Sequence, residues 1–203
     1  MAETAAETPP EIPAATLVVF RRAPDRGAPE LLMVVRSRDM SFAGGMAVFP
    51  RGRVDPQDHE LARALGGPFE EEETAHRIAA IRETLEETGL ALGFTEAIDR
   101  DRALAMRARL EDARALAPVL DEFHVTLALD RLVPFARWCP RGMAHSRIFD
   151  TRFYLYNIGT GAVELAVDAT ENTRLFWITA AQALERADQG DLSVIFPTRR
   201  NLE

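Results

Sequence analysis

Apolar and β-branched residues fill two short segments near the N-terminus, ATLVVFRR at residues 15–22 and ELLMVVRSR at residues 30–38. The intervening APDRGAP carries the proline and glycine that mark turns, so the two segments predict a β-hairpin. A further short strand is predicted within GGMAVFPRG. The segment GRVDPQD, which follows it, predicts a loop because proline and aspartate interrupt the apolar pattern.

The apolar spacing changes to three and four between residues 70 and 90, where Ile78, Ile81 and Leu85 recur on one face of a predicted helix. Acidic residues 70–73 suit the start of this helix, and Gly89 predicts its end. Residues 99–123 predict a second helix, broken near Pro118. Strands are predicted in RLVPFARW, DTRFYLYNI and TRLFWIT, and a final helix in AAQALERADQG.

Strands come first and return after the central helices, so the pattern predicts a mixed α/β (α+β) fold with helices flanking a mixed β-sheet. Residues 1–13 are rich in Ala, Glu and Pro and are predicted to form a disordered tail. No polar linker divides the rest of the chain. Residues 14–203 are therefore predicted to form a single domain.

Composition narrows the classes of function. The 203 residues carry a net charge of −8, which argues against non-specific nucleic-acid binding. No apolar run is long enough to span a membrane and no signal peptide is evident, so a soluble, cytoplasmic protein is expected. Cys139 alone cannot form an internal disulfide, which fits a reducing compartment. All 24 basic residues are arginines, which excludes a Schiff-base lysine and a P-loop lysine.

The segment RETLEETGL, residues 82–90, places Glu83, Glu86 and Glu87 on one arc of the predicted helix. Like charges at this spacing destabilise a helix by a few tenths of a kcal/mol per pair. A divalent cation such as Mg²⁺ would offset the repulsion and keep coordination positions for water and phosphate. Arg82 precedes Glu86 by one turn and is expected to orient it. A solvated acidic face is the alternative.

RETLEETGL resembles the second half of the signature of the Nudix hydrolase family, with Thr84 in place of an aliphatic residue. FPRG, residues 49–52, resembles the Phe-Pro-Gly-Gly of the first half, with Arg51 replacing its first glycine. Gly52 lies 30 residues before Arg82, whereas the signature has 14, which implies an insertion of 16. We place this insertion at about residues 53–72.

The signature also calls for a glutamate where this sequence has Thr74, with Glu73 next to it. A late acidic residue acts as metal ligand or base in some family members, and Glu171, six residues before Trp177, has the matching position. Whether Glu73 or Glu171 adds a carboxylate to the site stays open.

The resemblance implies an α/β/α sandwich with a mixed sheet and a helical insertion at about residues 100–124. It implies a hydrolase that uses Mg²⁺ or Mn²⁺ to cleave a diphosphate linkage. The implied metal ligands are Glu83, Glu86 and Glu87. The implied catalytic residues are Arg82, Glu86 and Glu171, and the implied substrate-binding residues are Arg36, Arg51, Gly52 and Arg53.

Within the family, LVPFARW and FDTRFYL resemble the branch of the peroxisomal coenzyme A diphosphatase and its bacterial relatives, over roughly residues 16–198. RSRDMSFAGGMAVFPRG partly matches the motif of coenzyme A-cleaving members, with Ser41 in place of arginine. Coenzyme A or an acyl-coenzyme A is the expected substrate. The segment Ala103–Phe123 is expected to contact its acyl or pantetheine arm.

Other substrates and another class of function stay open. ADP-ribose, a nucleotide sugar or a dinucleotide would suit the same chemistry, and a non-catalytic nucleotide-sensing Nudix domain is a different class. Sensing domains usually lose one of the signature glutamates, whereas this chain has all three. A small-molecule partner is expected rather than nucleic acid or a membrane, and a homodimer is left open.

Overall fold

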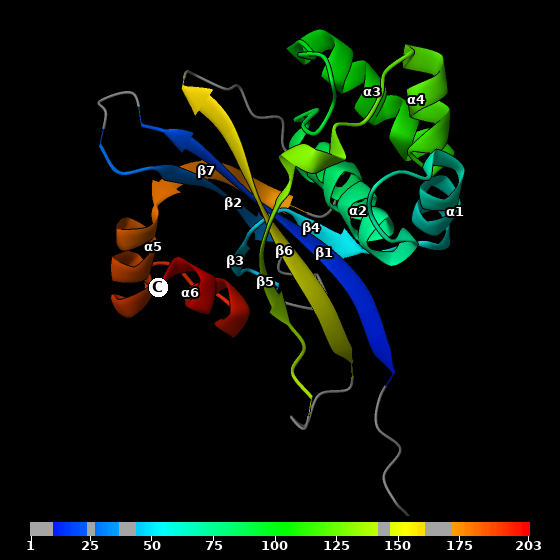
Figure 1. Cartoon of the computed structure of the whole chain (residues 1–203). Helices are drawn as coiled ribbons and strands as arrows, with labels where there is room; N and C mark the ends of the chain where they lie inside the picture. Colours follow the sequence, from blue (N-terminus) through cyan, green and yellow to red (C-terminus); the bar gives the residue numbers. More distant parts are fainter. Residues whose placement is uncertain (1–9, 24–26, 37–43, 142–146, 161–171) are drawn as a thin grey trace, which may run out of the picture.

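The computed structural model describes residues 10–23, 27–36, 44–141, 147–160 and 172–203, and helices cover both faces of one mixed sheet (Figure 1). Its strands are β1 (Glu11–Arg22), β2 (Glu30–Arg36), β3 (Ala47–Val48), β4 (Arg51–Arg53), β5 (Val133–Trp138), β6 (Ile148–Thr160) and β7 (Asn172–Thr179). Its helices are α1 (Pro56–Leu65), α2 (Glu71–Thr88), α3 (Arg100–Ala113), α4 (Ala117–Phe123), α5 (Ala180–Asp188) and α6 (Phe196–Leu202), with a short 3₁₀ turn at Leu129–Arg131. The predicted mixed α/β class is confirmed.

The long strand β1 organises the sheet, in which the strands follow the order β3-β2-β1-β6-β5. One edge of β1 is shared between two antiparallel neighbours, β4 opposite Ala14–Thr16 and β2 opposite Phe20 and Arg21. The other edge runs parallel to β6 along most of its length. The antiparallel pairing of β1 with β2 confirms the predicted hairpin, and it leaves β4 free to lie beside the start of β1.

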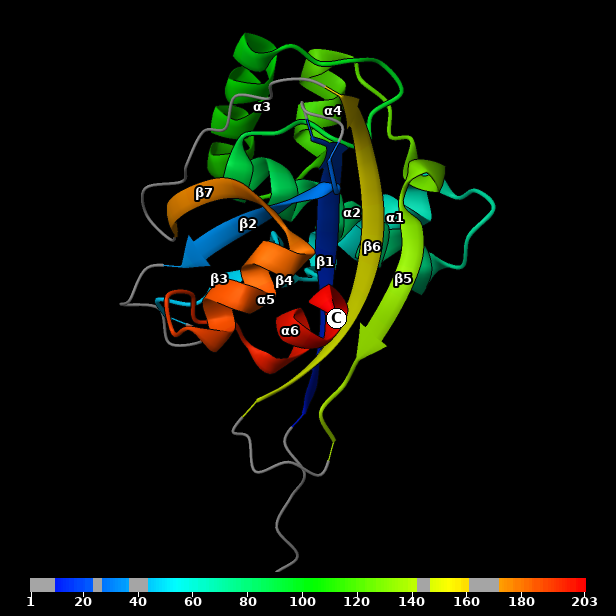
Figure 2. The ribbon, with the colours of Figure 1, turned by 90° about the vertical axis from the view of Figure 1, so that its left-hand side faces the viewer.

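Alternate residues of β1 face opposite sides of the sheet and supply two cores. Leu17 and Val19 pack with α2 and the α3–α4 pair, whereas Val18 packs with Met33 and residues of α5. Figure 2, turned by 90°, shows α5 and α6 on the near face of the sheet and the other helices behind it. The sheet therefore separates two helical layers.

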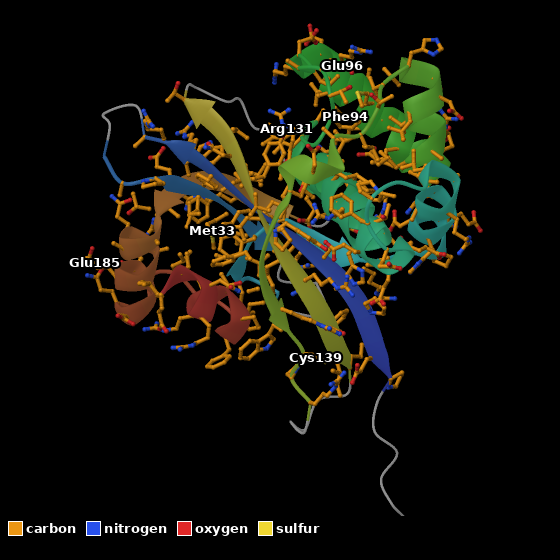
Figure 3. The ribbon with its side chains drawn as sticks, viewed as in Figure 1. Met33, Phe94, Glu96, Arg131, Cys139 and Glu185 are labelled. Atoms are coloured by element: carbon orange, nitrogen blue, oxygen red, sulfur yellow. The ribbon has the colours of Figure 1, made fainter. Side chains whose placement is uncertain are left out.

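Side chains mark the two cores in Figure 3, where Met33 lies on the α5 side of the sheet and Phe94 lies beside α3. Both residues are almost fully buried. No helix in the described ranges is long and apolar enough to cross a membrane.

The helix α2 is buried on most of its surface because α1, α3, β1 and β4 all contact it. Ile78, Ile81 and Leu85 are completely buried, as their spacing predicts. Gly89 adopts φ 70°, a left-handed conformation that glycine takes without steric cost, and its N–H donates to the Leu85 carbonyl at 3.0 Å. The predicted end of the helix is thus confirmed.

One local prediction is wrong, and another is confirmed with a small shift along the chain. The segment predicted as a loop after Gly52 turns into a helix at Pro56, because Pro56 suits the first helical turn and Asp58 accepts a hydrogen bond from the Asp55 N–H at 2.9 Å. The break predicted near Pro118 is present at residues 114–116, where the left-handed backbone of Arg114 ends α3. Pro118 then lies in the first turn of α4.

Candidate active site

Strand β4 and helix α2 meet at Gly52 and Glu83. A Cβ atom on Gly52 would lie 1.9 Å from Cδ of Glu83 and 2.0 Å from its Oε1, so the carboxylate occupies the space that any other residue would fill. The sequence placed Gly52 at the start of a predicted loop. Instead, Gly52 lies within β4, paired with Ala15 of β1, and its role is to admit the carboxylate against the strand.

Arg82 is the centre of the site and is only 4% exposed. Its Nη1 donates to Oε1 of Glu83 at 2.7 Å and to Oε2 of Glu86 at 3.3 Å, so the predicted contact with Glu86 is present. Its Nη2 also donates to the Arg53 carbonyl at 2.9 Å. The guanidinium therefore joins α2 to β4.

Sequence reasoning missed Asp58, which holds the other side of this guanidinium. Asp58 is 1% exposed and accepts from Arg82 Nε at 3.0 Å and Nη2 at 2.9 Å, a bidentate pair. It lies in the first turn of α1, inside the segment predicted as a loop. The signal that could have located it was the Asp-Pro-x-Asp spacing of a helix start, in which one carboxylate caps the helix.

Glu87 points to the other end of β4. It is 3% exposed, and its Oε2 accepts from the Arg51 N–H at 3.0 Å. Glu86 is the most exposed of the three glutamates, because 28% of its side chain is exposed and only 15% of that of Glu83. Three carboxylates of one helical segment thus line β4, two of them around Arg82 and one under Arg51.

Burial shapes the charge of these groups. Desolvation raises the pKa of Glu83 to about 8; the Arg82 charge opposes this, and the neighbouring Glu86 and Glu87 reinforce it. Burial and the nearby Arg36 charge lower the pKa of Arg51 to about 10, although the charges of Glu87 and Glu83 act to raise it. Because Arg82 is shared with Asp58, the three glutamates carry an excess of negative charge that a cation would relieve.

The donor set suits a hard cation, since all three groups offer carboxylate oxygens. Among the residues the structure describes, however, the group whose candidate ligand atoms all lie within 4.8 Å is Glu11, Cys139 and Asp150, not the glutamates of α2. In that group Arg141 donates to Glu11 at 2.8 Å and Arg137 donates to Asp150 at 2.8 Å, so ion pairs explain it. Binding one ion between Glu83, Glu86 and Glu87 requires their side chains to turn from Arg82 and Arg51.

A scan of protein-family models finds no match, nor does a search of curated protein sequences. Among solved structures, a NUDIX hydrolase from Alicyclobacillus acidocaldarius matches with a TM-score of 0.80 and 28% identity over 97% of this chain and 91% of that one. The chain has the fold of the Nudix hydrolases.

More distant matches agree on the fold. A MutT NUDIX hydrolase from Burkholderia pseudomallei has a TM-score of 0.53 and 15% identity over 95% of this chain and 96% of that one. The NUDIX domain of Shewanella oneidensis NrtR, in complex with ADP ribose, has a TM-score of 0.53 and 11% identity over 95% and 84%. Both structures share the fold of this chain.

In the Nudix fold seen here, the start of α2 adds no carboxylate to the glutamates. Thr74 is buried at the helix start, and Glu73 accepts from Arg77 at 2.8 Å and Arg152 at 2.7 Å. Glu73 also precedes Glu83 by ten residues, which is about 15 Å along a helix. Glu171 and Ser41 lie outside the described residues, so the predicted role of Glu171 stays a prediction.

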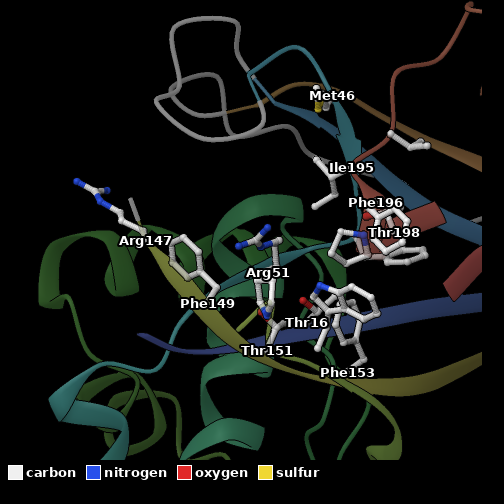
Figure 4. Close-up of a pocket in the computed structure, with 15 residues that line it drawn as sticks. Thr16, Met46, Arg51, Arg147, Phe149, Thr151, Phe153, Ile195, Phe196 and Thr198 are labelled. Carbon is white, nitrogen blue, oxygen red and sulfur yellow. The ribbon is translucent and has the colours of Figure 1, made fainter. Parts of the chain in front are cut away.

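The predicted substrate-binding arginines differ in their surroundings. Arg36 is buried at the end of β2, and its charge acts on Arg51. The Arg53 side chain is exposed, while its carbonyl holds Arg82. The Arg51 side chain lines a pocket on the α6 side of the sheet, with its guanidinium carbon 5.4 Å from the centre of the Phe149 ring (Figure 4).

We call this cavity the aromatic pocket. It measures about 370 Å³. Its walls come from β1, β4, β5, β6 and the start of α6, and no residue of Ala103–Phe123 lines it. The lining residues are Thr16, Met46, Phe49, Arg51, Trp138, Pro140, Arg147, Phe149, Thr151, Phe153, Val194, Ile195, Phe196, Pro197 and Thr198. Arg51 is the residue that belongs to both the pocket and the glutamate site.

Proposed function

We propose that this chain is a Mg²⁺- or Mn²⁺-dependent hydrolase that cleaves the diphosphate linkage of a nucleoside diphosphate-linked compound. The observation that carries the proposal is the group of three glutamates gathered against β4, with Glu83 and Glu86 at the Arg82 guanidinium and Glu87 at the Arg51 N–H. Burial and repulsion from Glu86 and Glu87 raise the pKa of Glu83 to about 8. The negative charge of the three glutamates is therefore not fully balanced by the arginines beside them. The Nudix fold of its structural relatives supports a hydrolase.

In this proposal Glu83, Glu86 and Glu87 hold the cation, and Gly52 leaves room for the Glu83 carboxylate. Arg82 is a positioning residue, since Asp58 fixes its guanidinium from one side while Glu83 and Glu86 receive its other N–H groups. A bound divalent ion supplies charge neutralisation for the phosphates and lowers the pKa of the attacking water.

Arg51 has the position to bind a substrate phosphate. Its backbone N–H donates to Glu87, while its side chain lines the aromatic pocket. A guanidinium suits this task because its planar donors match phosphate oxygens. Arg36 lies nearby as a second cation.

The general base is proposed to be Glu171 or Glu86. Residues 14–203 are proposed to act as one domain.

For the substrate we propose coenzyme A or an acyl-coenzyme A, on the strength of the partial sequence motif that ends at Gly52. ADP-ribose, a nucleotide sugar and a dinucleotide are the alternatives. The Shewanella domain in complex with ADP ribose shares the fold at 11% identity, which leaves this choice to experiment.

The test is to incubate the protein with Mg²⁺ or Mn²⁺ and, separately, coenzyme A, an acyl-coenzyme A, ADP-ribose, a nucleotide sugar and a dinucleoside polyphosphate. Products are resolved by mass. Release of 3′,5′-adenosine diphosphate supports the coenzyme A assignment, and cleavage of another compound keeps the chemistry but discards that substrate. Binding without cleavage of any compound would favour a nucleotide sensor.

Glu87→Gln tests the metal site directly. It keeps the size of the side chain and removes the charge, so we expect kcat to fall by at least about 10²-fold, the scale of losing one transition-state-stabilising group. Glu185→Gln is the matched control, because Glu185 is exposed on α5, on the other face of the sheet. Full activity of Glu87→Gln on a compound that the wild type cleaves would refute the assignment.

A further inference from the structure

We infer that the aromatic pocket binds the uncharged, mainly apolar end of the substrate, and that Thr16 forms a hydrogen bond with a polar atom of that end. The inference rests on the proposed function, because it names what lies beyond the scissile diphosphate. The sequence predicted that the helical segment Ala103–Phe123 contacts this end of the substrate. The aromatic pocket lies on the opposite face of the sheet from that segment.

Thr16 provides the first argument. It lies in the middle of the sheet, between Phe153 of β6 and Arg51 of β4, and is 1% exposed. Thr16 is one of the residues that line the pocket, and its buried Oγ1 has no hydrogen-bond partner among the residues that the structure describes. A buried hydroxyl without a partner is costly, and a ligand atom inside the pocket would satisfy it.

The chemistry of the walls provides the second argument. Five aromatic side chains line the pocket, and the polar side-chain groups among its lining residues are three threonine hydroxyls, two guanidinium groups and the indole N–H of Trp138. No carboxylate or amide side chain is among the lining residues. The pocket therefore disfavours a cationic group, and it suits a neutral ring or chain that packs on aromatic faces.

The mouth of the pocket provides the third argument. Phe196, at the start of α6, is 59% exposed although it is a large apolar residue, and its ring lies 5.3 Å from that of Trp138. An occupant of the pocket would cover part of this ring. Burial of apolar area then contributes to binding in proportion to the area covered.

The orientation of the substrate follows from Arg51. Its guanidinium lies against Phe149 on the pocket side, and its backbone N–H bonds Glu87 on the side of the metal site. A diphosphate at Arg51 would have the glutamates on one side and the pocket on the other. The end attached to that diphosphate would then enter the pocket and reach Thr16.

The experiment uses Trp138 as reporter. Trp138 and Trp177 are the two tryptophans of the chain, and Trp177 does not line the pocket, so Trp177→Phe leaves a single fluorophore at the site. This protein, without metal, is titrated with phenyl phosphate, adenosine 5′-monophosphate, phosphopantetheine and inorganic phosphate. We expect one of the organic phosphates to bind at least about tenfold more tightly than inorganic phosphate, because burying a ring or chain is worth that much.

Two variants locate the contact. Phe196→Ala should weaken binding of that organic phosphate about tenfold, whereas Phe135→Ala, a similarly exposed phenylalanine on β5 outside the pocket, should not. Thr16→Val keeps the side-chain shape and should weaken binding of adenosine 5′-monophosphate or phosphopantetheine about fivefold, the value of one hydrogen bond. Phenyl phosphate has no polar atom at its ring end, so Thr16→Val should not weaken its binding.

Two results would overturn the inference: binding of all four compounds with equal affinity, or equal effects of Phe196→Ala and Phe135→Ala. The fluorescence titrations do not require the protein to cleave a substrate. Failure of this inference can therefore be distinguished from failure of the proposed function. Glu87→Gln, which should lower kcat by at least about 10²-fold, tests the cleavage alone. If the protein cleaves nothing but the variants behave as stated, the pocket stands and the hydrolase proposal falls.

Discussion

The substitution Gly52→Ala should lower the activity and leave the stability of the fold nearly unchanged. The new Cβ would lie 1.9 Å from Cδ of Glu83, whereas an ordinary carbon–carbon contact is about 3.5 Å, so the carboxylate must move by roughly 1.5 Å. A misplacement of about 1 Å at a reacting centre costs on the order of 10²-fold in rate, so kcat should fall by at least about that factor. Glu83 is flexible at its end and Gly52 does not have positive φ, so the free energy of unfolding should change by less than about 1 kcal/mol.

The assay combines kcat on whichever diphosphate is cleaved with urea unfolding followed by circular dichroism. Gly159→Ala is the informative control, because Gly159 has φ +79° and open space around its missing Cβ. That variant should lose about 1 kcal/mol of stability through backbone strain and retain full activity. An unchanged kcat in Gly52→Ala, with Glu87→Gln inactive, would refute the close packing of Glu83 on β4 as a requirement for catalysis.

Two other predictions concern the groups around Arg82. Asp58→Asn removes one partner of a buried ion pair and should lower the free energy of unfolding by about 3 kcal/mol, whereas Asp121→Asn, on the exposed end of α4, should have no measurable effect in the same urea titration. Loss of activity without loss of stability in Asp58→Asn would contradict this structural role. The pKa of Glu83 is raised by burial from 4.5 to about 8, so in the metal-free folded protein it stays protonated where the unfolded chain is ionised. Its stabilising contribution is therefore complete below pH 4.5 and is lost as the pH rises to about 8. Thermal unfolding with a chelator should show this decline, Glu83→Gln should reduce it, and Mn²⁺ should oppose it; a decline of equal size in Glu83→Gln would assign the effect to another group.

The sequence alone determined several local features of α2. The spacing of Ile78, Ile81 and Leu85 fixed which face of α2 is buried, because a helix repeats every 3.6 residues whatever surrounds it. Gly89 marked the helix end, because glycine adopts the left-handed conformation most readily. The arc of Glu83, Glu86 and Glu87 and the proximity of Arg82 to Glu86 followed from the same helical geometry.

Only the tertiary structure decided what those side chains meet. Pairing of β4 with the first half of β1 brings Gly52 against Glu83, and the packing of α1 on α2 brings Asp58 to Arg82, although 24 residues separate them. Local periodicity carries no information about such contacts, since they depend on which elements pack together. For the same reason, local periodicity does not reveal the parallel pairing of β1 with β6 or the place of Phe196 in the lining of the aromatic pocket, because both bring together segments that are far apart in the chain.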